Sequence, residues 1–307
     1  MRTLRIGTRR SDLAMVQARS VGETLQAAMP EVAVEYVPLV SQGDRRRGPL
    51  AEAGGKGLFT TDLEEALRVG SIDLAVHSAK DMPAEMADDL CIAAVPPRAD
   101  ARDVLVTREG LLLQELRKGA IVGTGSPRRA ALLRSARPDL QVAPIRGNVE
   151  TRFARAAGND ADLDAVVLAA AGLERLGWMD TRAECVCPLP VEEFPPAGGQ
   201  GTLVVQATQD SRWRGEVASG LDHGPSREAL LAERDVLRRL GASCTSCVSV
   251  YVFSVKAQWC LRAMVARPDG QDMLRQFVTS DSADGAALLA VSRLIRAGAL
   301  ERMEGID

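Results

Sequence analysis

A short apolar strand followed by a helix-forming segment recurs along this 307-residue chain. The strand-like run at 3–7 precedes apolar residues at helical spacing after Ser11. A further helix is expected at 60–70, where Thr61 and Glu64 have the spacing of a capping box. Strands that alternate with helices of this length predict an α/β fold with largely parallel sheets.

The same pattern restarts near residue 100 and later gives way to a different one. Residues 119–136 are typical of a strand, a turn and a helix, and four prolines interrupt the segment 188–196. After a helix expected at 226–241, three alternating strands follow one another with hairpin chemistry, and a last helix is expected at 283–297. The final third therefore predicts an antiparallel sheet with helices.

Composition and charge argue against several classes of protein. The chain has 38 basic and 41 acidic residues and a formal net charge of -3, whereas a general nucleic-acid-binding domain is expected to be basic. No run approaches the roughly 18 apolar residues of a membrane span, and the charged N-terminal segment lacks the apolar stretch of a signal peptide. We expect a cytoplasmic protein whose six cysteines are reduced thiols.

Arginines gather at three predicted junctions between a strand and a helix. Ser126 is expected to cap a helix that begins at Pro127, with Arg128 and Arg129 in its first turn. Free N–H groups and two guanidinium groups there favour an anion; the alternative is two solvated surface arginines. The other two junctions carry basic residues as well: Arg146 and Arg152, and Arg9 and Arg10. Three such junctions, expected to face a crevice between two α/β domains, favour a ligand with several carboxylates or phosphates.

Two loop segments carry single candidate groups. The glycine-rich segment 54–59 contains Lys56 but lacks the spacing of a P-loop, so we interpret it as a mobile loop with one cation. Asp81 follows a strand-like segment that ends in His77 and Ser78. A carboxylate in such a loop can act on protons or stabilise a cation, and the alternative is an ordinary turn aspartate.

Two closely spaced cysteine pairs leave several chemistries open. Cys185 and Cys187 could form a four-cysteine zinc site with Cys244 and Cys247, but neither pair has the knuckle glycines of a zinc ribbon. A redox pair is disfavoured because Cys244 follows a predicted helix instead of starting one. We expect no metal, which leaves a single nucleophilic thiol or a buried structural cysteine.

Seven motifs resemble, in order and spacing, the landmarks of the hydroxymethylbilane synthase family, also called the porphobilinogen deaminases. They are RIGTRRSDLAMVQA, GGKGLFTTDLEEAL, DLAVHSAKDMP, IVGTGSPRR, PIRGNVETR, DAVVLAAAGLERLG and PAGGQG. The resemblance implies an α/β chain with two domains built like type II periplasmic binding proteins and a small α+β domain with a three-stranded antiparallel sheet. The implied boundaries are 1–97 with 197–215 for domain 1, 98–196 for domain 2 and 216–307 for domain 3.

The resemblance also implies an activity. Members of the family are transferases that condense four porphobilinogen molecules head to tail, with release of ammonia, into 1-hydroxymethylbilane for heme biosynthesis. A dipyrromethane cofactor is attached through a thioether to a cysteine of the third domain. We therefore expect a monomer that binds this small molecule and neither nucleic acid nor membrane. The alternatives are a divergent paralogue that acts on another pyrrole carboxylate and a non-catalytic binder of a small polyanion.

Family roles carry over onto individual positions. Asp81 is the implied catalytic carboxylate, which helps to protonate the leaving amine and stabilises cationic pyrrole intermediates. The positions implied to bind the cofactor are Cys244, Lys80, Ser126, Arg128, Arg129, Arg146 and Gly147. The positions implied to bind substrate are Arg9, Ser11, Lys56, Phe59, Arg146, Arg152, Arg175 and Gln200.

The cofactor loop departs from the family pattern, which usually has two glycines before the cysteine, a proline after it and a tyrosine seven residues beyond. Here Tyr251 lies seven residues after Cys244, which assigns Cys244 to the cofactor position. Ala242, Ser243 and Cys247 replace the glycines and the proline, and neither Ala nor Ser reaches positive φ as readily as glycine. Two other positions differ from the usual lysine and glutamate: Glu52 and Gln206.

Overall fold

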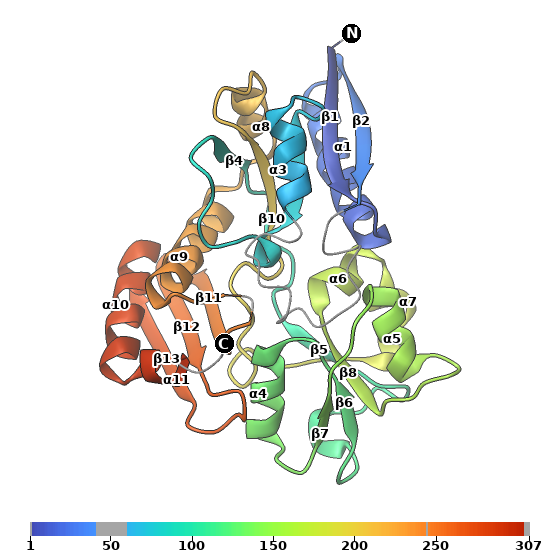
Figure 1. Ribbon diagram of the computed structural model, residues 1–307, viewed down its shortest axis with the longest axis vertical. Coiled ribbons are helices and arrows are strands. Elements are labelled where there is room, and N and C mark those ends of the chain that lie inside the picture. Colours follow the sequence, from blue (N-terminus) through green and yellow to red (C-terminus); the bar gives the residue numbers. More distant parts are fainter. Residues whose placement is uncertain (1, 41–59, 244, 304–307) are drawn as a thin grey trace. The chain divides into compact units, whose positions relative to one another are not determined.

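The structure is a computed structural model that describes residues 2–40, 60–243 and 245–303 (Figure 1). Contacts group the chain into two units, each described here by itself. Unit 1 comprises Met1–Ala99 and Thr202–Leu231, and unit 2 comprises Asp100–Gly201 and Ala232–Asp307. The division into three domains with the boundaries given above stays a prediction.

Unit 1 is built on a five-stranded sheet with the order β2-β1-β3-β10-β4. Its strands are β1 (Arg2–Arg9), β2 (Val32–Leu39), β3 (Leu74–Ser78), β4 (Leu90–Ala94) and β10 (Leu203–Thr208). Strand β1 pairs in parallel with β2 and β3, whereas β10 pairs antiparallel with β3 and β4. Because β1 and β3 are parallel neighbours, their carboxyl ends lie at the same edge of the sheet.

Helices cover this sheet and close its core. They are α1 (Asp12–Ala28), α3 (Thr61–Arg68), α8 (Arg214–Leu221) and the first part of α9 (Gly224–Leu240). The predicted apolar face of α1 is confirmed, since Val21 and Leu25 are buried in one cluster with Leu4 and Ile6 of β1. Trp213 joins the same cluster and is 1% exposed. Removal of these side chains from water is the main force that holds helix and sheet together.

Helix α3 lies within the predicted range 60–70, but the predicted capping box is wrong. The N-cap is Thr60, and its side chain makes no capping hydrogen bond. Glu64 instead accepts a hydrogen bond from Nε2 of Gln206 at 3.3 Å. The carboxylate of Glu64, which the local spacing assigned to the cap, therefore binds a residue of a distant strand instead.

Unit 2 contains a second five-stranded sheet, with the order β7-β6-β8-β5-β9. Its strands are β5 (Asp103–Val106), β6 (Ile121–Gly123), β7 (Gln141–Ala143), β8 (Ala165–Ala169) and β9 (Val186–Pro188). The helical segments are η3 (Leu113–Glu115), α4 (Pro127–Ala136), α5 (Val149–Ala157), α6 (Ala170–Arg175), α7 (Trp178–Thr181) and η4 (Ala183–Cys185). In both sheets three parallel strands are followed by an antiparallel one, so the predicted pair of α/β folds of the type II periplasmic-binding kind is confirmed.

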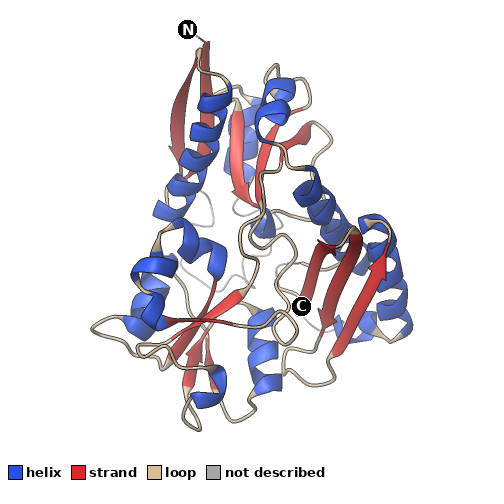
Figure 2. Cartoon of the chain, turned by 180° about the vertical axis from the view of Figure 1, so that it is seen from behind, coloured by secondary structure: helices blue, strands red, loops and turns tan. Residues whose placement is uncertain are grey.

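A three-stranded antiparallel sheet follows in unit 2, as predicted. It consists of β11 (Val248–Val255), β12 (Gln258–Val265) and β13 (Leu274–Ser280), with helices α10 (Ala283–Arg296) and α11 (Ala299–Met303). Figure 2 shows α10 along one face of this sheet. The predicted turn between β12 and β13 is present, with Gly270 at φ 80° and its N–H donated to the carbonyl of Arg267 at 2.9 Å.

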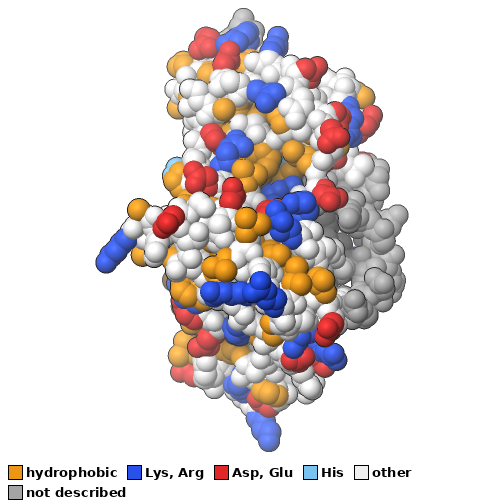
Figure 3. Space-filling view, turned by 90° about the vertical axis from the view of Figure 1, so that its left-hand side faces the viewer, with side chains coloured by type: hydrophobic (Ala, Val, Ile, Leu, Met, Phe, Trp, Pro, Cys, Tyr) orange, Lys and Arg blue, Asp and Glu red, His pale blue; other side chains and the backbone are white. Residues whose placement is uncertain are grey.

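The surface carries charges of both signs. On the face in Figure 3, Lys and Arg side chains are interspersed with Asp and Glu side chains. This mixture agrees with the formal net charge of -3. No helix in the three described stretches of chain is long and apolar enough to cross a membrane.

Candidate active site

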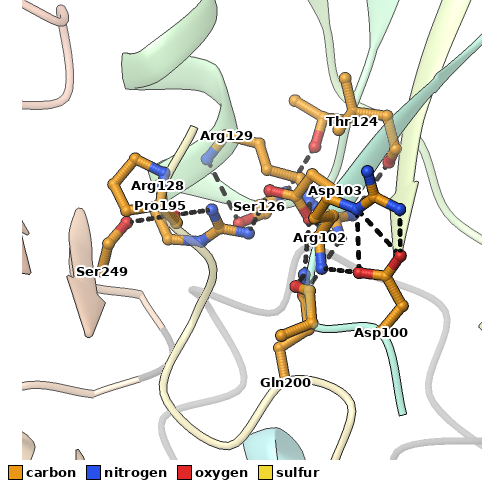
Figure 4. A network of polar contacts seen from close by, with 12 residues as sticks. Asp100, Arg102, Asp103, Thr124, Ser126, Arg128, Arg129, Pro195, Gln200 and Ser249 are labelled. Atoms are coloured by element: carbon orange, nitrogen blue, oxygen red, sulfur yellow. Dashed lines mark hydrogen bonds and ion pairs between the residues drawn. The ribbon is translucent and has the colours of Figure 1, made fainter. Parts of the chain in front are cut away.

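The predicted helix start after β6 is confirmed and brings two arginines onto a buried carboxylate. Ser126 caps α4 by accepting a hydrogen bond from the N–H of Arg129 at 3.4 Å, and Pro127 is the first helical residue. Oδ1 of Asp103, the first residue of β5, accepts hydrogen bonds from Nε and Nη2 of Arg129 at 3.0 and 2.8 Å. Oδ2 of Asp103 forms an ion pair with Nη2 of Arg128 at 2.8 Å (Figure 4).

Further contacts hold this cluster in place. Gln200 donates from Nε2 to Asp103 at 2.8 Å and to the carbonyl of Ala101 at 2.7 Å. Arg128 donates from Nη1 to the carbonyl of Pro195 at 2.8 Å, and the hydroxyl of Ser249 donates to the same oxygen at 2.7 Å. Strand β5, helix α4, strand β11 and the segment 195–200 therefore meet at one polar cluster (Figure 4).

The charges of the cluster do not cancel. Burial by itself raises the pKa of Asp103, but the positive charges of Arg128 and Arg129 outweigh burial and lower this pKa to about 2. Burial lowers the pKa of Arg128. One ionised carboxylate therefore faces two guanidinium groups, which leaves one excess positive charge at the N-terminus of α4, where the helix dipole adds to it.

The two arginines are not the solvated surface residues that the sequence left as an alternative. Arg128 is 3% exposed and Arg129 is 6% exposed. Nε of Arg128 has no hydrogen-bond partner among the described residues, so one buried donor of the pair remains available. Their role in binding a ligand stays a prediction.

Asp103 and Glu233 were missed by the sequence analysis. Asp103 is signalled only by an acidic residue in front of the apolar run VLV, which by itself is not specific. Glu233 on α9 is fully buried, and its two oxygens accept hydrogen bonds from the N–H groups of Gly199 at 2.6 Å and Val252 at 2.8 Å. Glu233 thereby ties the segment that carries Gln200 to strand β11.

The second predicted basic junction of unit 2 lies in front of α5. Gly147 has φ 110°, and a Cβ atom there would lie 2.9 Å from the side chain of Thr151, so the position requires glycine. Asn148 caps the helix by accepting from the N–H of Thr151 at 2.9 Å. Nε of Arg152 donates to the carbonyl of Gly147 at 2.8 Å, while Arg146 is exposed. Arg146 therefore has the exposure that contact with an anion in solution requires.

Arg175 lies at the end of α6 and is partly buried. Its Nη2 donates to the carbonyl of Gly201 at 2.7 Å. Burial lowers its pKa. The guanidinium is thus held beside the glycine-rich segment that also carries Gln200.

In unit 1 the structure brings predicted residues from the ends of two strands to one edge of the sheet. Lys80 and Asp81 form the 3-10 turn η2 (Ala79–Asp81) directly after β3, and Arg9 ends β1. The register Gly7↔Ala75 makes β1 and β3 parallel neighbours, so both groups follow carboxyl ends of adjacent strands. The predicted helix start at Ser11 is confirmed, although its hydroxyl makes no capping hydrogen bond.

Backbone hydrogen bonds hold the turn that carries Asp81 at its start and at its end. The N–H of Ala79 donates to the carbonyl of Thr202 at 3.0 Å, and the N–H of Met82 donates to the carbonyl of Ala79 at 3.2 Å. Met82 is buried, whereas the Asp81 side chain between these contacts is exposed. Asp81 is therefore an exposed carboxylate on a firmly held turn, as proton transfer to a bound molecule requires.

The structure shows where three of the cysteine side chains named above lie. Cys185 packs against the apolar cluster that contains Ile145 and Phe153, and Cys187 against the cluster that contains Leu105 and Leu189. The four-cysteine zinc alternative includes Cys244, which lies outside the described residues, so it stays untested. Cys247 is fully buried, and burial raises the pKa of its thiol to about 11, which makes it a poor nucleophile.

Several predicted positions lie outside the described residues: Lys56, Phe59, Cys244 and Glu52. Near Cys244 the structure describes Tyr251, whose ring stacks on that of Phe253 with 4.9 Å between the ring centroids. Ser243 and Ser246 are joined by hydrogen bonds, from the N–H of Ser243 to the hydroxyl of Ser246 at 3.0 Å and from the N–H of Ser246 to the carbonyl of Ser243 at 3.1 Å.

Comparison with known proteins matches these features to one family. Residues 4–214 match the family described as "Porphobilinogen deaminase, dipyromethane cofactor binding domain". The porphobilinogen deaminase of Leifsonia xyli is 45% identical over 94% of this chain and 88% of its own length. That of Sorangium cellulosum is 44% identical over 89% of both chains, and that of Alkaliphilus metalliredigens is 38% identical over 100% of this chain and 96% of its own. The chain therefore belongs to the porphobilinogen deaminase family.

Proposed function

We propose that this protein condenses four porphobilinogen molecules head to tail into 1-hydroxymethylbilane and releases one ammonia molecule at each addition. The observation that carries the proposal is the exposed carboxylate of Asp81 at the same sheet edge as Arg9, in a chain of this family. A carboxylate can serve the departing amine, and a neighbouring cation can hold a substrate carboxylate.

The chemistry of the substrate defines what Asp81 has to do. Porphobilinogen is a pyrrole with an aminomethyl group and two carboxylate side chains. Loss of ammonia requires a protonated amine and leaves a cation that is delocalised over the pyrrole ring. A new C–C bond then joins this methylene carbon to a pyrrole carbon, which loses its proton. Asp81 would hold the proton at the leaving amine and afterwards stabilise the ring cation through the pyrrole N–H.

The basic residues would bind the carboxylates of the growing chain. In unit 1 these are Arg9 and Lys80, together with the hydroxyl of Ser11. In unit 2 they are Arg146, Arg152 and Arg175, with Gln200 as an amide donor. Arg146 is exposed, and Arg152 and Arg175 are partly exposed, so each can meet a ligand from solution. Guanidinium groups bind carboxylates through paired hydrogen bonds, which suits a product with many acetate and propionate groups.

The cluster at the N-terminus of α4 fits a dipyrromethane cofactor, which also carries carboxylates. One excess positive charge and the buried, unpartnered Nε of Arg128 are suited to an anion. Ser126, Arg128, Arg129, Arg146 and Gly147 in unit 2 and Lys80 in unit 1 would hold the group, with Cys244 as its covalent attachment. When bound, it supplies the pyrrole carbon to which the first substrate is joined.

Activity is tested directly on the purified protein. Incubation with porphobilinogen should release ammonia and yield uroporphyrin after oxidation of the product. A protein that binds porphobilinogen without releasing ammonia would instead support the non-catalytic binder. Ammonia without uroporphyrin would support a paralogue with another product.

The attachment site is tested by the intact mass of the chain. The mass should include one dipyrromethane, and the Cys244→Ser variant should lack it. Cys247→Ser is the matched control, because it removes a thiol three residues away that is buried and fully protonated at neutral pH. Loss of the adduct in Cys247→Ser alone would move the attachment site. A cytoplasmic location and a monomeric state stay predictions.

A further inference from the structure

Three side chains in unit 1 form a line of hydrogen bonds that the proposed chemistry does not use. Nε2 of His77 on β3 lies 2.9 Å from Oε1 of Gln206 on β10, and Nε2 of Gln206 lies 3.3 Å from Oε1 of Glu64 on α3. The register pairs Val204 with His77 and Gln206 with Ala75, so the imidazole and the amide are on the same face of the sheet. His77 is 6% exposed and Gln206 is 0% exposed.

The chemistry of the three groups fixes the direction of these bonds. Nε2 of Gln206 donates to the carboxylate oxygen Oε1 of Glu64, so the NH₂ group of the amide faces Glu64. The amide oxygen of Gln206 then faces His77 and can only accept. Nε2 of His77 must therefore carry a proton and donate it, which defines the tautomer of the neutral ring.

The surroundings oppose a positive charge on this ring. Burial lowers the pKa of His77 to about 4; the hydrogen bond to Gln206 acts in the opposite direction, and the positive charge of Arg9 lowers the pKa further. Glu64 meets the ring only through the uncharged amide of Gln206. Because Gln206 is uncharged, its hydrogen bond to His77 does not bring a negative charge to the ring that would stabilise the imidazolium form.

The position of the line connects it with the candidate catalytic turn. His77 is the residue before the last one of β3, and the turn with Lys80 and Asp81 begins directly after that strand. The same strand β10 that supplies Gln206 is preceded by Thr202, whose carbonyl accepts from Ala79 of the turn. One strand therefore holds both the end of β3 and the start of the turn.

We propose that Gln206 is a positioning residue that holds His77 as an uncharged Nε2–H imidazole and fixes the end of β3 directly in front of Lys80 and Asp81. Its consequence for turnover rests on the proposed function. The hydrogen-bond and charge assignment does not, because it can be measured without substrate.

The first test is NMR titration of the histidine rings. The chain has two histidines, His77 and His223, so the variant of either one assigns the signal of the other. The ring signals of His77 should stay constant from pH 8 to pH 5.5 in the wild-type chain. In Gln206→Glu the buried carboxylate should stabilise the imidazolium, and the midpoint should move upward by about one pH unit or more.

Two results would overturn the assignment. One is a His77 signal that titrates near pH 6.5 in the wild-type chain, which would mean a solvated ring. The other is a titration unchanged by Gln206→Glu in a folded variant, which would mean that the amide does not control the ring. Both measurements remain informative if the protein proves to have no deaminase activity.

The second test distinguishes a positioning role of His77 and Gln206 from a direct chemical role of the His77 imidazole. Gln206→Leu removes both hydrogen bonds at similar volume, and we expect kcat to fall about ten-fold while KM changes little. His77→Leu should lose a similar factor, and His77→Gln should recover most of it because an amide can still donate to Gln206. Equal losses in His77→Gln and His77→Leu, or a loss confined to the unfolding midpoint, would contradict the proposal. Circular dichroism of each variant checks that it is folded.

Discussion

Oδ1 of Asp103 on β5 lies 2.8 Å from Nη2 of Arg129 on α4, and neither side chain is more than 8% exposed. Arg128 approaches the other oxygen of the same carboxylate at 2.8 Å. A buried charge is stable only when it is paired and hydrogen-bonded, so both guanidinium groups depend on Asp103. Without the Asp103 carboxylate, the two buried guanidinium groups at the N-terminus of α4 would lack a counter-charge.

Asp103→Asn should strongly destabilise the protein because it leaves two buried guanidinium groups without a counter-charge. We expect the free energy of unfolding to fall by roughly 3 kcal/mol or more, measured by urea denaturation at pH 7. Asp162→Asn is the matched control in the same unit, since Asp162 forms an exposed pair with Arg155 and should change stability little. Equal effects of the two substitutions would show that burial of the pair is unimportant.

Asp81→Ala should leave the fold intact and reduce turnover. The side chain is exposed and its turn is held by backbone hydrogen bonds of Ala79 and Met82. We expect the unfolding midpoint and the attached cofactor mass to persist while kcat falls by roughly 10²-fold or more. Asp88→Ala, at another exposed aspartate of unit 1, should keep normal turnover. Near-normal turnover of Asp81→Ala would remove it from the proposed chemistry.

Arg146→Gln should weaken substrate binding without changing stability. Arg146 is exposed and precedes the cap of α5, where loss of a guanidinium–carboxylate contact should raise KM by about ten-fold. Arg155→Gln is the control on the helix that follows Arg146, because Arg155 is paired with Asp162. Steady-state kinetics with porphobilinogen distinguish the two; the same KM in both variants would exclude Arg146 from substrate binding.

The buried ring of His77 should make the protein sensitive to mild acid. Its pKa is lowered from 6.5 to about 4, so between these values the unfolded chain takes up a proton that the folded chain does not. The free energy of unfolding should therefore fall as the pH decreases through this window, by roughly 2 kcal/mol between pH 7 and pH 5. His77→Gln should lack this part of the pH dependence. A parallel decline in both proteins would assign the acid sensitivity to other groups.

Local patterns were sufficient for much of the fold. The apolar spacing of α1, the Ser126-Pro127 start of α4 and the alternating strands of the last sheet are confirmed, because each depends on residues within one or two turns of chain. The capping box of α3 failed for the opposite reason. Glu64 is bound by Gln206, which lies 142 residues further along the chain.

The amino-acid pattern was enough to predict the family, many of the helices and strands, and the polar residues that follow strand ends, but not strands β4, β5, β9 and β10. It did not determine what those residues touch. For Arg128 and Arg129 the sequence left solvated side chains open as an alternative, and only the fold shows that Asp103 and Gln200 lie against them. Hydrophobic periodicity is a local property, whereas the partner of a buried charge depends on which distant segments meet, and only the tertiary structure decides that.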